Sequence, residues 1–398
     1  MIALSAFNKS YLCALSLFVL WSGAGFHRAC ATEISLEFKR EKLSDERFEA
    51  AAACDVDQDG IKDIVSGGFW YAGPDYKTRH KICEVSPSGE YYDDFSDYPM
   101  DVNGDSYPDI ITGGFFGGPL RWRENPKDNT TEWKEHPIAQ VGAIETTRFW
   151  DLDGDGHSEI VPNASGNIIA FKLLRDANGK GTGEFTSHTV KMGGIGHGLG
   201  YGDINMDGVA DFIGPDAWYE APPKPMEGPH WTEHKDFKLG SASVPILVHD
   251  VNQDGLNDLI VGHAHGYGLF WMEQIRTNDD TTSWAKHMIT YNVSQFHDIA
   301  LHDIDNDGEM ELVTGKRYRA HNGQDPGAED PLGVYYYNIN GGAFDRVTVD
   351  FGPADNHSGM GIYFWVEDVD GNGWKDIVAP GKQGLYLFRN MGPAKKVE

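Results

Sequence analysis

Cysteine is scarce in this chain of 398 residues, with only four in the whole sequence. Two of them lie in an N-terminal segment that we expect to be removed, which leaves Cys54 and Cys83. Two thiols cannot supply the disulfide framework typical of small secreted domains. We expect both to be small buried apolar groups, so something other than disulfides must hold this fold together.

Basic residues are also few, because 33 Lys and Arg face 61 Asp and Glu and give a formal charge of -28. Removing residues 1–31 takes away Lys9 and Arg28 and no acid, so the remaining chain carries 31 minus 61, or -30. A surface with this balance repels a phosphate backbone. The composition therefore excludes nucleic acid as a partner.

A hydrophobic run long enough to cross a membrane is absent, since the apolar stretch at 11–20 soon meets serine and glycine and a span needs about 20 residues. Lys9 precedes the stretch, and Ala29-Cys30-Ala31 follows as a small-x-small cleavage pattern. We predict a signal peptide at 1–31 and an exported protein, secreted or periplasmic, that begins near Thr32 and has no membrane span.

What the chain does contain is one nine-residue pattern repeated seven times. Each copy has Asp at position 1, Asp or Asn at 3 and 5, and Asp or Glu at 9, followed by apolar residues. The copies begin at Asp55, Asp101, Asp151, Asp203, Asp250, Asp303 and Asp368. Intervals of 46 to 65 residues with strand-like flanks predict an all-β fold, a seven-bladed β-propeller of four-stranded antiparallel blades.

Oxygen groups at alternate positions of a tight turn favour a hard cation, above all Ca²⁺, with Mg²⁺ as an alternative in some loops. An EF-hand would need Glu at position 12 and flanking helices, and neither is found. The predicted ligands are Asp55, Asp57, Asp59, Asp63, Asp101, Asn103, Asp105, Asp109, Asp151, Asp153, Asp155, Glu159, Asp203, Asn205, Asp207, Asp211, Asp250, Asn252, Asp254, Asp258, Asp303, Asp305, Asp307, Glu311, Asp368, Asp370, Asn372 and Asp376. Repeat 2 departs from the pattern because Ser106 stands where the others have Gly.

The repeats use the whole of 32–398, so we predict a single domain without linkers. The chain ends before the last blade can form a fourth strand. Phe38 and Leu43 are spaced as Trp133 and Ile138 are on an outer strand. We therefore expect the segment 36–43 to complete the last blade and close the ring, covering two sheet edges.

Polar side chains recur at the strand ends opposite the acidic loops. The position six residues before a motif, at the start of an inner strand, holds Glu145, His197 and His297 in three of the seven repeats. The position thirteen residues after a motif holds His263 and Lys316 in two of them. We predict a site built from His197, His297, His263 and Glu145, surrounded by His265, Lys316, Arg317, Arg319, His321, His357 and Lys382. The longest insertion, 316–327, adds a loop to the same face, where function tends to lie.

Two kinds of chemistry fit this group. Imidazoles with a carboxylate could hold Zn²⁺ with an open position in the central channel. Alternatively, His with Lys or Tyr could remove a proton next to a sugar carbonyl or a uronate while Arg stabilises the anion. A third interpretation is that these residues only line a solvated channel mouth.

Five other histidines recur on the outer strand of successive blades, which favours packing over catalysis. They are His80, His136, His188, His234 and His287. Tryptophans such as Trp70, Trp218, Trp271 and Trp365 could stack on sugar rings, but propeller cores use tryptophan for packing as well.

The pattern Asp-x-Asp-x-Asp-Gly-x-x-Asp-Ile-Val, as at 55–65, resembles the FG-GAP/VCBS repeats of secreted propellers and, more distantly, of integrin α-subunits. The stretch 196–203, Phe296-His297-Asp298 and the insertion at 316–327 resemble the propeller part of the aldos-2-ulose dehydratase family, whose members are longer chains. That resemblance implies a carbon–oxygen lyase that dehydrates sugars, and we transfer no catalytic residue from it. The alternatives are a non-catalytic sugar-binding propeller and one that binds a cell-surface protein. We expect a monomer.

Overall fold

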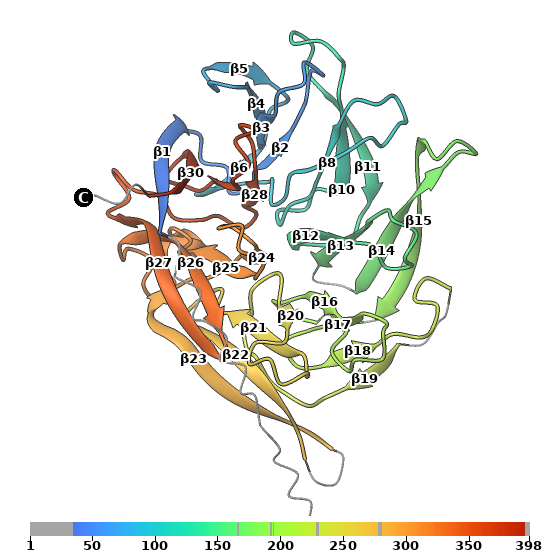
Figure 1. Ribbon diagram of the computed structural model, residues 1–398. Coiled ribbons are helices and arrows are strands. Elements are labelled where there is room, and N and C mark those ends of the chain that lie inside the picture. Colours follow the sequence, from blue (N-terminus) through green and yellow to red (C-terminus); the bar gives the residue numbers. More distant parts are fainter. Residues whose placement is uncertain are drawn as a thin grey trace, which may run out of the picture. The chain divides into compact units, whose positions relative to one another are not determined.

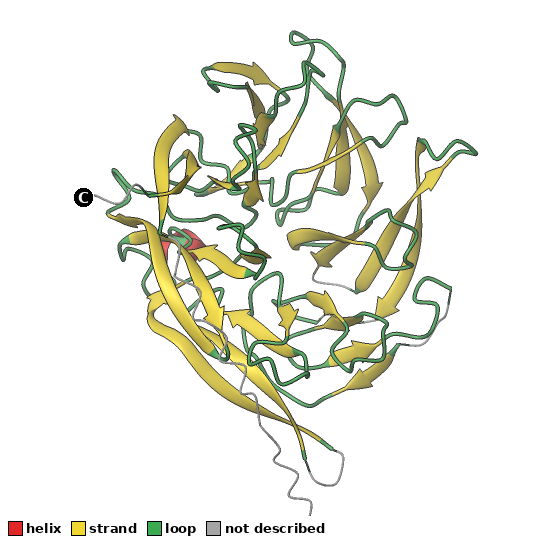
Figure 2. Ribbon diagram, viewed as in Figure 1, coloured by secondary structure: helices red, strands yellow, loops and turns green. Residues whose placement is uncertain are grey.

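The structure, a computed structural model, describes residues 35–164, 167–191, 193, 195–227, 231–277 and 281–394. In the unit that begins at Leu36, seven four-stranded sheets are arranged in a ring and a short hairpin, β6–β7, lies apart from them. All strand pairs in these sheets are antiparallel, and almost no helix is present in the described residues (Figures 1 and 2). The predicted all-β, seven-bladed propeller is confirmed.

In blades 1 to 6 the strands follow one another in chain order from the channel outward, and only blade 7 takes its outer strand from the other end of the described chain. Blade 1 contains β2 (Ala52–Cys54), β3 (Asp63–Ser66), β4 (Phe69–Ala72) and β5 (Thr78–Lys81). Blade 2 contains β8 (Tyr98–Met100), β9 (Asp109–Thr112), β10 (Leu120–Glu124) and β11 (Lys134–Ala139). Blade 3 contains β12 (Ile144–Trp150), β13 (Glu159–Ala164), β14 (Ile168–Arg175) and β15 (Gly181–Lys191). Blade 4 contains β16 (Gly200–Gly202), β17 (Asp211–Ile213), β18 (Trp218–Glu220) and β19 (Thr232–His234).

The remaining blades are built in the same way. Blade 5 contains β20 (Leu247–His249), β21 (Asp258–Gly262), β22 (Tyr267–Arg276) and β23 (Thr282–Ser294). Blade 6 contains β24 (Ile299–His302), β25 (Glu311–Gly315), β26 (Leu332–Asn340) and β27 (Ala343–Gly352). Blade 7 contains β28 (Trp365–Glu367), β29 (Asp376–Ala379), β30 (Leu385–Pro393) and β1 (Leu36–Ser44). Outside these sheets lie the hairpin of β6 (Pro87–Ser88) and β7 (Tyr91–Tyr92) and the short α1 (Ala320–Gly323).

The N-terminal strand closes the ring. Strand β1 pairs antiparallel with β30, and the register joins Phe38 to Asn390 and Lys42 to Tyr386. The first described strand and the last are thus side by side in one blade (Figure 1). The side chain of Phe38 packs against the cluster between blades 6 and 7, so the predicted closure is confirmed.

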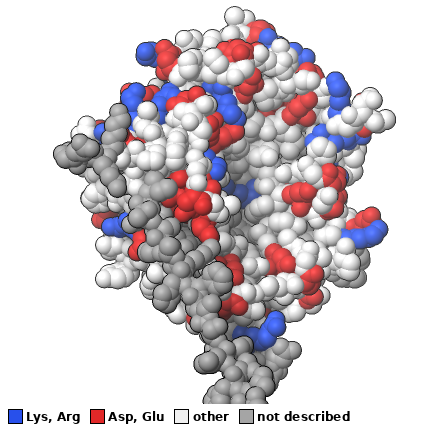
Figure 3. All heavy atoms as spheres, viewed as in Figure 1, with Lys and Arg blue, Asp and Glu red and all other residues white. Residues whose placement is uncertain are grey.

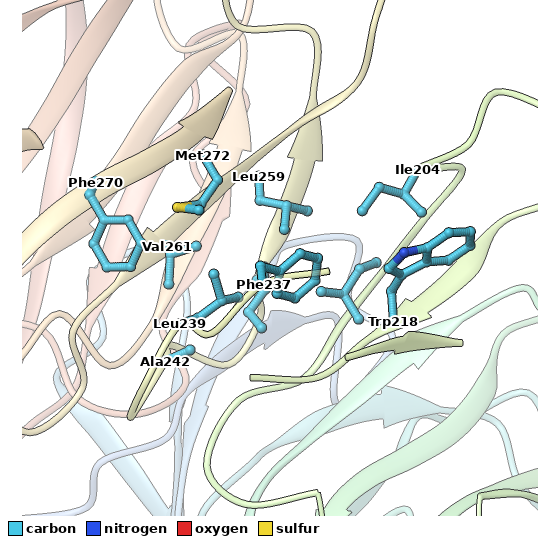
Figure 4. Packing of buried hydrophobic residues seen from close by; sticks show 11 residues of the cluster. Ile204, Trp218, Phe237, Leu239, Ala242, Leu259, Val261, Phe270 and Met272 are labelled. Atoms are coloured by element: carbon cyan, nitrogen blue, oxygen red, sulfur yellow. The ribbon is translucent and has the colours of Figure 1, made fainter. Parts of the chain in front are cut away.

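The second strand of each blade is buried on both faces, which explains the unbroken apolar residues that follow each acidic motif. One apolar cluster fills the space between each pair of neighbouring blades. Between blades 4 and 5, Trp218 and Phe237 belong to the same cluster as Leu259 and Phe270 (Figure 4). Blade-to-blade burial of apolar area is therefore what holds the ring together.

All seven acidic loops connect the first strand of a blade to its second, and neighbouring loops touch one another around the ring. The Gln58 amide donates to the Ser106 carbonyl at 2.6 Å, and the Asn257 amide donates to the Asp203 carbonyl at 2.6 Å. The loops therefore share one face. The turns between second and third strands, and the segments that enter each first strand, lie at the opposite strand ends.

Cys54 and Cys83 are free thiols, as expected. No helix among the described residues is both long and apolar enough to span a bilayer. The predicted signal peptide at 1–31 lies outside the described residues.

Candidate functional site

Four side chains that could bind a metal meet at the channel, at the strand ends opposite the acidic loops. Glu145 is on β12, His197 and His297 precede β16 and β24, and His265 lies in the turn between β21 and β22. One ligand atom from each of the four lies within 4.8 Å of all the others. Residues from blades 3, 4, 5 and 6 thus converge on one point, and we call these four the histidine cluster.

The contacts inside the histidine cluster are short. His197 Nε2 lies 3.1 Å from His297 Nε2 and 3.4 Å from Glu145 Oε2. His297 Nε2 lies 3.7 Å from the same carboxylate oxygen. The rings of His197 and His265 meet edge to face, with centroids 4.6 Å apart, so the nitrogen atoms are crowded around one centre.

Two of the imidazoles are oriented by acceptors on their other ring nitrogen. His197 Nδ1 is 2.7 Å from the Ala242 carbonyl oxygen, which can only accept, so Nδ1 carries the proton. His265 Nδ1 is 2.8 Å from Asp325 Oδ2. Bonds of this kind hold the ring in position and direct Nε2 toward the centre of the cluster, as in metal-binding histidines.

Burial governs the charges in the histidine cluster. It holds the pKa of His297 well below its ordinary value, and burial with the nearby His197 and Arg317 lowers the pKa of His265 to about 4. Both imidazoles are therefore neutral at pH 7. Burial would raise the pKa of Glu145, but the adjacent imidazoles of His197 and His297 outweigh it and lower that pKa, so the carboxylate stays ionised.

A cavity of about 370 Å³ opens beside the histidine cluster, and Glu145 and His265 form part of its wall. Four aromatic rings line it as well, from Tyr91, Phe95, Phe115 and Phe116. The polar part of the lining is completed by Ser88, Arg317, His321, Asn322 and Gln324. In the space-filling view the middle of the ring is hollowed, and Lys or Arg atoms lie inside the hollow (Figure 3).

Phe115 and Phe116 are 41 % and 42 % exposed, although large aromatic side chains are usually buried. Their loop is anchored, because the Phe116 backbone N–H donates to Asp93 Oδ1 at 3.0 Å and Arg121 donates to the Asp93 carbonyl at 2.6 Å. The rings are thus presented to the cavity on a fixed support. We did not predict these two residues from the sequence, although the run Gly-Gly-Phe-Phe-Gly-Gly at 113–118 marks an exposed turn that carries aromatic rings.

The predicted cations lie around the cavity, but most are already paired or bonded. Arg317 forms two hydrogen bonds to Glu49, at 2.8 and 3.2 Å, and both residues are buried. Arg319 binds Glu90 and Glu329, and the ammonium group of Lys382 donates to the Arg319 carbonyl. Burial lowers the pKa of Lys316 to about 8, and its ammonium group donates to the Arg317 carbonyl.

His321 belongs to the insertion of blade 6 and lines the cavity. Its Nδ1 is 2.7 Å from Asp325 Oδ1, so Asp325 joins His321 to His265 of the histidine cluster. Arg319, His321 and Asn322 all have left-handed backbone conformations in and beside α1. Non-glycine residues held in this conformation often mark functional sites. Asp325, which the sequence analysis did not single out, is the link between the two histidines.

Two predicted residues lie elsewhere. His263 is not part of the histidine cluster, because His265, two residues later in the same turn, supplies the third imidazole instead. His263 has a buried Nδ1 without a hydrogen-bond partner, and burial lowers its pKa. His357 contacts Asp350 and Arg40 near the closing strand, away from the cavity lining.

The acidic loops share one hydrogen-bond pattern. In every loop the backbone N–H of position 2 donates to the carboxylate of position 9, and the N–H of position 6 donates to the Asp of position 1. Position 6 has φ near +90° where it is Gly and +78° at Ser106, so Ser106 adopts the required turn at a cost in strain.

Some loop oxygens lack partners, which fits a cation site. Asp55 Oδ1 and Asp303 Oδ1 are buried without a hydrogen bond. A buried carboxylate oxygen without a donor is unfavourable. The crowding of these carboxylates is consistent with a divalent ion at the centre of the loop.

The recurring outer-strand histidines have a packing role, as expected. His80, His136, His234 and His287 stack on the tryptophans of the adjacent strand, with ring centroids 4.1 to 4.6 Å apart. The tryptophans they cover include Trp70, Trp218 and Trp271, so those rings are not free to bind sugars. Trp365 donates its N–H to Glu367 at 2.9 Å.

A second cavity, of about 610 Å³, lies against blade 4 and is lined by residues such as Lys191, Tyr219, Glu233 and Phe237. No member of the histidine cluster lines it. A large volume does not by itself indicate a functional site. The smaller cavity therefore remains the candidate site, because Glu145 and His265 line it.

Comparisons with known proteins agree with this architecture. The FG-GAP-like repeat matches residues 101–161 and 250–314. No curated protein matches the sequence. Among solved structures, an Agrocybe aegerita lectin described as recognising non-reducing terminal N-acetylglucosamine is 15% identical, with a TM-score of 0.44 over 79% of this chain and 80% of that one.

Two further structures are similar at the same level. BBS1N, solved in complex with ARL6DN, is 12% identical, with a TM-score of 0.47 over 91% of this chain and 98% of that one. Rhamnogalacturonan lyase YesW is 10% identical, with a TM-score of 0.45 over 91% and 73%. These likenesses are too distant to carry a function. The sheets and the matched repeats together identify the chain as a seven-bladed β-propeller built with FG-GAP-like repeats.

Proposed function

We propose that this chain is an exported, calcium-binding propeller that acts as a metal-dependent carbon–oxygen lyase on a sugar. The observation that supports the proposal best is the histidine cluster, in which four ligand atoms lie within 4.8 Å of one another beside a cavity with aromatic walls. The interpretation of these residues as a mere channel lining does not account for four converging donors.

The donor set fits a transition metal of the zinc type. Three imidazoles and one carboxylate are borderline ligands that suit Zn²⁺ better than Ca²⁺, and the lowered pKa values of His265 and His297 favour the neutral form that a metal requires. Glu145, His197, His265 and His297 would hold the ion. Once bound, such an ion supplies Lewis acidity toward a carbonyl or hydroxyl oxygen.

His321 is the imidazole that the chain itself offers for proton transfer. Its side chain is 59 % exposed, and Asp325 accepts from its Nδ1, so Nε2 can accept a proton from a substrate carbon. In an elimination, that proton passes to His321, the C–H electrons form a double bond, and the leaving hydroxyl departs as water after taking a proton back. Arg317, fixed by Glu49, contributes positive charge near the developing anion.

The cavity suits a carbohydrate. The faces of sugar rings carry C–H groups that pack on aromatic side chains, and the exposed Phe115 and Phe116 offer such surfaces. Asn322, Gln324 and Ser88 provide hydrogen-bonding groups on the same lining. This combination of aromatic and polar groups is typical of small-molecule sites.

The acidic loops would bind Ca²⁺ on the other face, where they reinforce the ring rather than take part in chemistry. Because the acidic loops and the histidine cluster lie at opposite ends of the strands, an ion in a loop would be structural and an ion in the histidine cluster would be catalytic. Mg²⁺ remains an alternative in loops with fewer carboxylates.

A second candidate is a sugar-binding propeller without turnover. The anchored, exposed pair Phe115 and Phe116 favours it, because a rigid aromatic surface is enough to bind a sugar ring. Zinc at the histidine cluster together with turnover would distinguish the enzyme from the binder.

The test combines elemental analysis with an activity assay on the exported protein. The wild type is expected to contain one zinc-type ion in addition to calcium, and to produce ultraviolet absorbance from an unsaturated product when supplied with keto sugars. His297→Ala should lose the ion and the activity. His321→Ala should keep the ion and lose activity by about 100-fold or more.

His357→Ala is the matched control, because this histidine also contacts a carboxylate but lies away from the cavity. It should retain both metal and activity. Saturable sugar binding without product would favour the second candidate. A wild-type protein with no transition metal, or with activity untouched in both His297→Ala and His321→Ala, would refute the lyase.

A further inference from the structure

One position on the third strand of every blade faces the ninth residue of the acidic loop. Loop position 10 pairs with a third-strand residue in each blade, for example Ile160 with Phe171 and Leu259 with Met272. Because the strands are antiparallel, the residue that follows this partner lies opposite position 9. The residues at this facing position are Ala72, Glu124, Lys172, Glu220, Glu273, Asn338 and Arg389.

In blade 3 the facing position places an ammonium group among the loop carboxylates. Lys172 Nζ lies 2.5 Å from Asp153, 2.7 Å from Asp155 and 3.3 Å from Glu159. These three residues occupy positions 3, 5 and 9 of the loop, where a divalent ion would be bound. The side chain of Lys172 is only 27 % exposed, so its charge is directed into the loop rather than into solvent.

Blade 7 has an arginine at the facing position. Arg389 NH1 lies 3.2 Å from Asp370, which is position 3 of that loop, and its side chain is 12 % exposed. The guanidinium group also lies 3.4 Å from Glu41 on the closing strand. Two of the seven loops thus contain a built-in cation that contacts a predicted calcium ligand.

In three other blades the facing position is Glu, and the loop is altered to match. Blades 2, 4 and 5 carry Glu124, Glu220 and Glu273 there, and these are the three blades with Asn instead of Asp at position 3. The amide of Asn252 donates to Glu273 at 3.3 Å, and that of Asn103 to Glu124 at 3.5 Å. A negative facing residue therefore goes with a neutral position 3, and a positive facing residue goes with Asp.

Because Glu at the facing position accompanies Asn at position 3, the number of carboxylates around the loop is the same in five blades. Loops 1 and 6 have four carboxylates and an uncharged facing residue, whereas loops 2, 4 and 5 have three carboxylates plus the facing Glu. Each of these five blades therefore presents four carboxylates. In blades 3 and 7 the facing cation instead reduces the negative charge of the loop. The net charge is -3 in blade 3, and it is -2 in blade 7, because Asn372 stands there at position 5 in place of an acid.

Blade 2 contains one more lysine near its loop, and it differs from Lys172. Lys127 lies 2.9 Å from Asp105, but its side chain is 45 % exposed and this is its one ion pair in the described residues. Surface pairs of this kind are weak and screened by salt. Lys127 is therefore a natural control for the two facing cations.

We propose that Lys172 and Arg389 take the place of a divalent ion in loops 3 and 7, so that five loops rather than seven bind calcium. The inference rests on the proposed function only in that the remaining loops bind Ca²⁺. A fixed cation within about 3 Å of the ligand oxygens repels a divalent ion and uses the same lone pairs. The residue opposite position 9 thus selects which loops are metal sites.

The experiment counts calcium ions bound per full-length chain by isothermal titration and by elemental analysis, at about 1 mM free Ca²⁺, a concentration at which extracellular sites fill. The wild type should bind five. Lys172→Met and Arg389→Met should each bind one more, and the double variant seven. Lys127→Met should still bind five.

The reverse substitution, Ala72→Lys, places a cation at the facing position of blade 1 and should reduce the count by one. It keeps the idea testable if either loss-of-charge variant fails to fold, which circular dichroism would reveal. Seven ions of similar affinity in the wild type, or an unchanged count in Lys172→Met and in Ala72→Lys, would overturn the inference. A wild type that binds no calcium at all would instead overturn calcium binding itself.

Discussion

The buried pair of Glu49 and Arg317 shows how single residues set the shape of the candidate site. Arg317 lines the cavity, and Glu49 fixes its guanidinium group through two hydrogen bonds from a position 4 % exposed. Burial would raise the pKa of Glu49, but Arg317 and Lys382 lower it below its ordinary value. The pair therefore stays charged and rigid, which costs desolvation but orients a cation toward the cavity.

Replacing Arg317 with Met should destabilise the protein by about 3 kcal/mol, because it leaves the Glu49 carboxylate buried without its main partner. The free energy of unfolding, measured in urea at pH 7, tests this. The double variant Glu49→Gln with Arg317→Met should recover most of the loss. If the single and double variants were equally unstable, the loss would come from packing rather than charge.

The lowered pKa of Glu49 also predicts how the stability of the protein changes with pH. The folded-state pKa of Glu49 lies below its ordinary value of 4.5, so its contribution is present above that pH and is lost as the pH falls below it. In the double variant this part of the acid sensitivity should be missing.

At the scale of the element, the outer strands repeat one arrangement. A histidine stacks on the tryptophan of the third strand, and in blades 2, 4 and 5 the same histidine lies 2.7 to 2.8 Å from the glutamate that faces the acidic loop. The outer edge of the blade is thus connected to the loop at its end. This arrangement explains why the recurring histidines are structural while the unrepeated His265 and His321 line the cavity.

Deleting residues 35–44 removes β1 and exposes β30 as a free edge, together with apolar residues between blades 6 and 7. We expect insolubility, or a melting temperature lower by roughly 10 °C or more, since the apolar contacts of the partly buried Leu36, Phe38 and Leu43 are lost together with the pairing of β1 and β30. Differential scanning calorimetry would measure it. A deletion of 1–31 that leaves β1 intact is the control and should melt like the exported protein; an unchanged melting temperature without β1 would contradict the closure.

At the scale of the molecule, the ring is closed without covalent links, since the cysteines that the structure describes are free. Apolar clusters join each blade to the next, and side chains such as Gln274 and Asn390 reach the loop of the preceding blade, donating to the Ile204 and Ile304 carbonyls at 2.9 Å. The loops are therefore part of the blade-to-blade contacts. An ion bound in a loop would stabilise the ring as a whole.

Removing calcium with a chelator should lower the melting temperature, because each occupied site contributes about 2.7 kcal/mol when the ion is present at 100 times its dissociation constant. The effect should be reversed by excess Ca²⁺ and only partly by Mg²⁺. Protease resistance of the ring at 37 °C provides an independent measure. A melting temperature indifferent to both chelator and calcium would show that the loops hold no ion that matters for stability.

The seven motifs were sufficient to predict the number of blades and the face that carries the loops, because both depend on local period and turn chemistry. The closing strand could also be predicted, since Phe38 and Leu43 repeat the spacing of an outer strand. Three members of the histidine cluster were found by counting back from each motif to the start of an inner strand.

The other features of the candidate site could not be predicted from the sequence, because they depend on how the blades pack together. Whether His263 or His265 reaches the channel depends on the course of the turn between β21 and β22, and sequence spacing cannot distinguish the two. The role of Asp325 depends on its contact with His265 of the neighbouring blade. The role of Phe115 and Phe116 depends on a cavity whose other walls include Glu145, His265 and Arg317. Local pattern determines a repeated element, whereas a site shared by several repeats is determined by how the closed ring brings different residues from equivalent positions to one point.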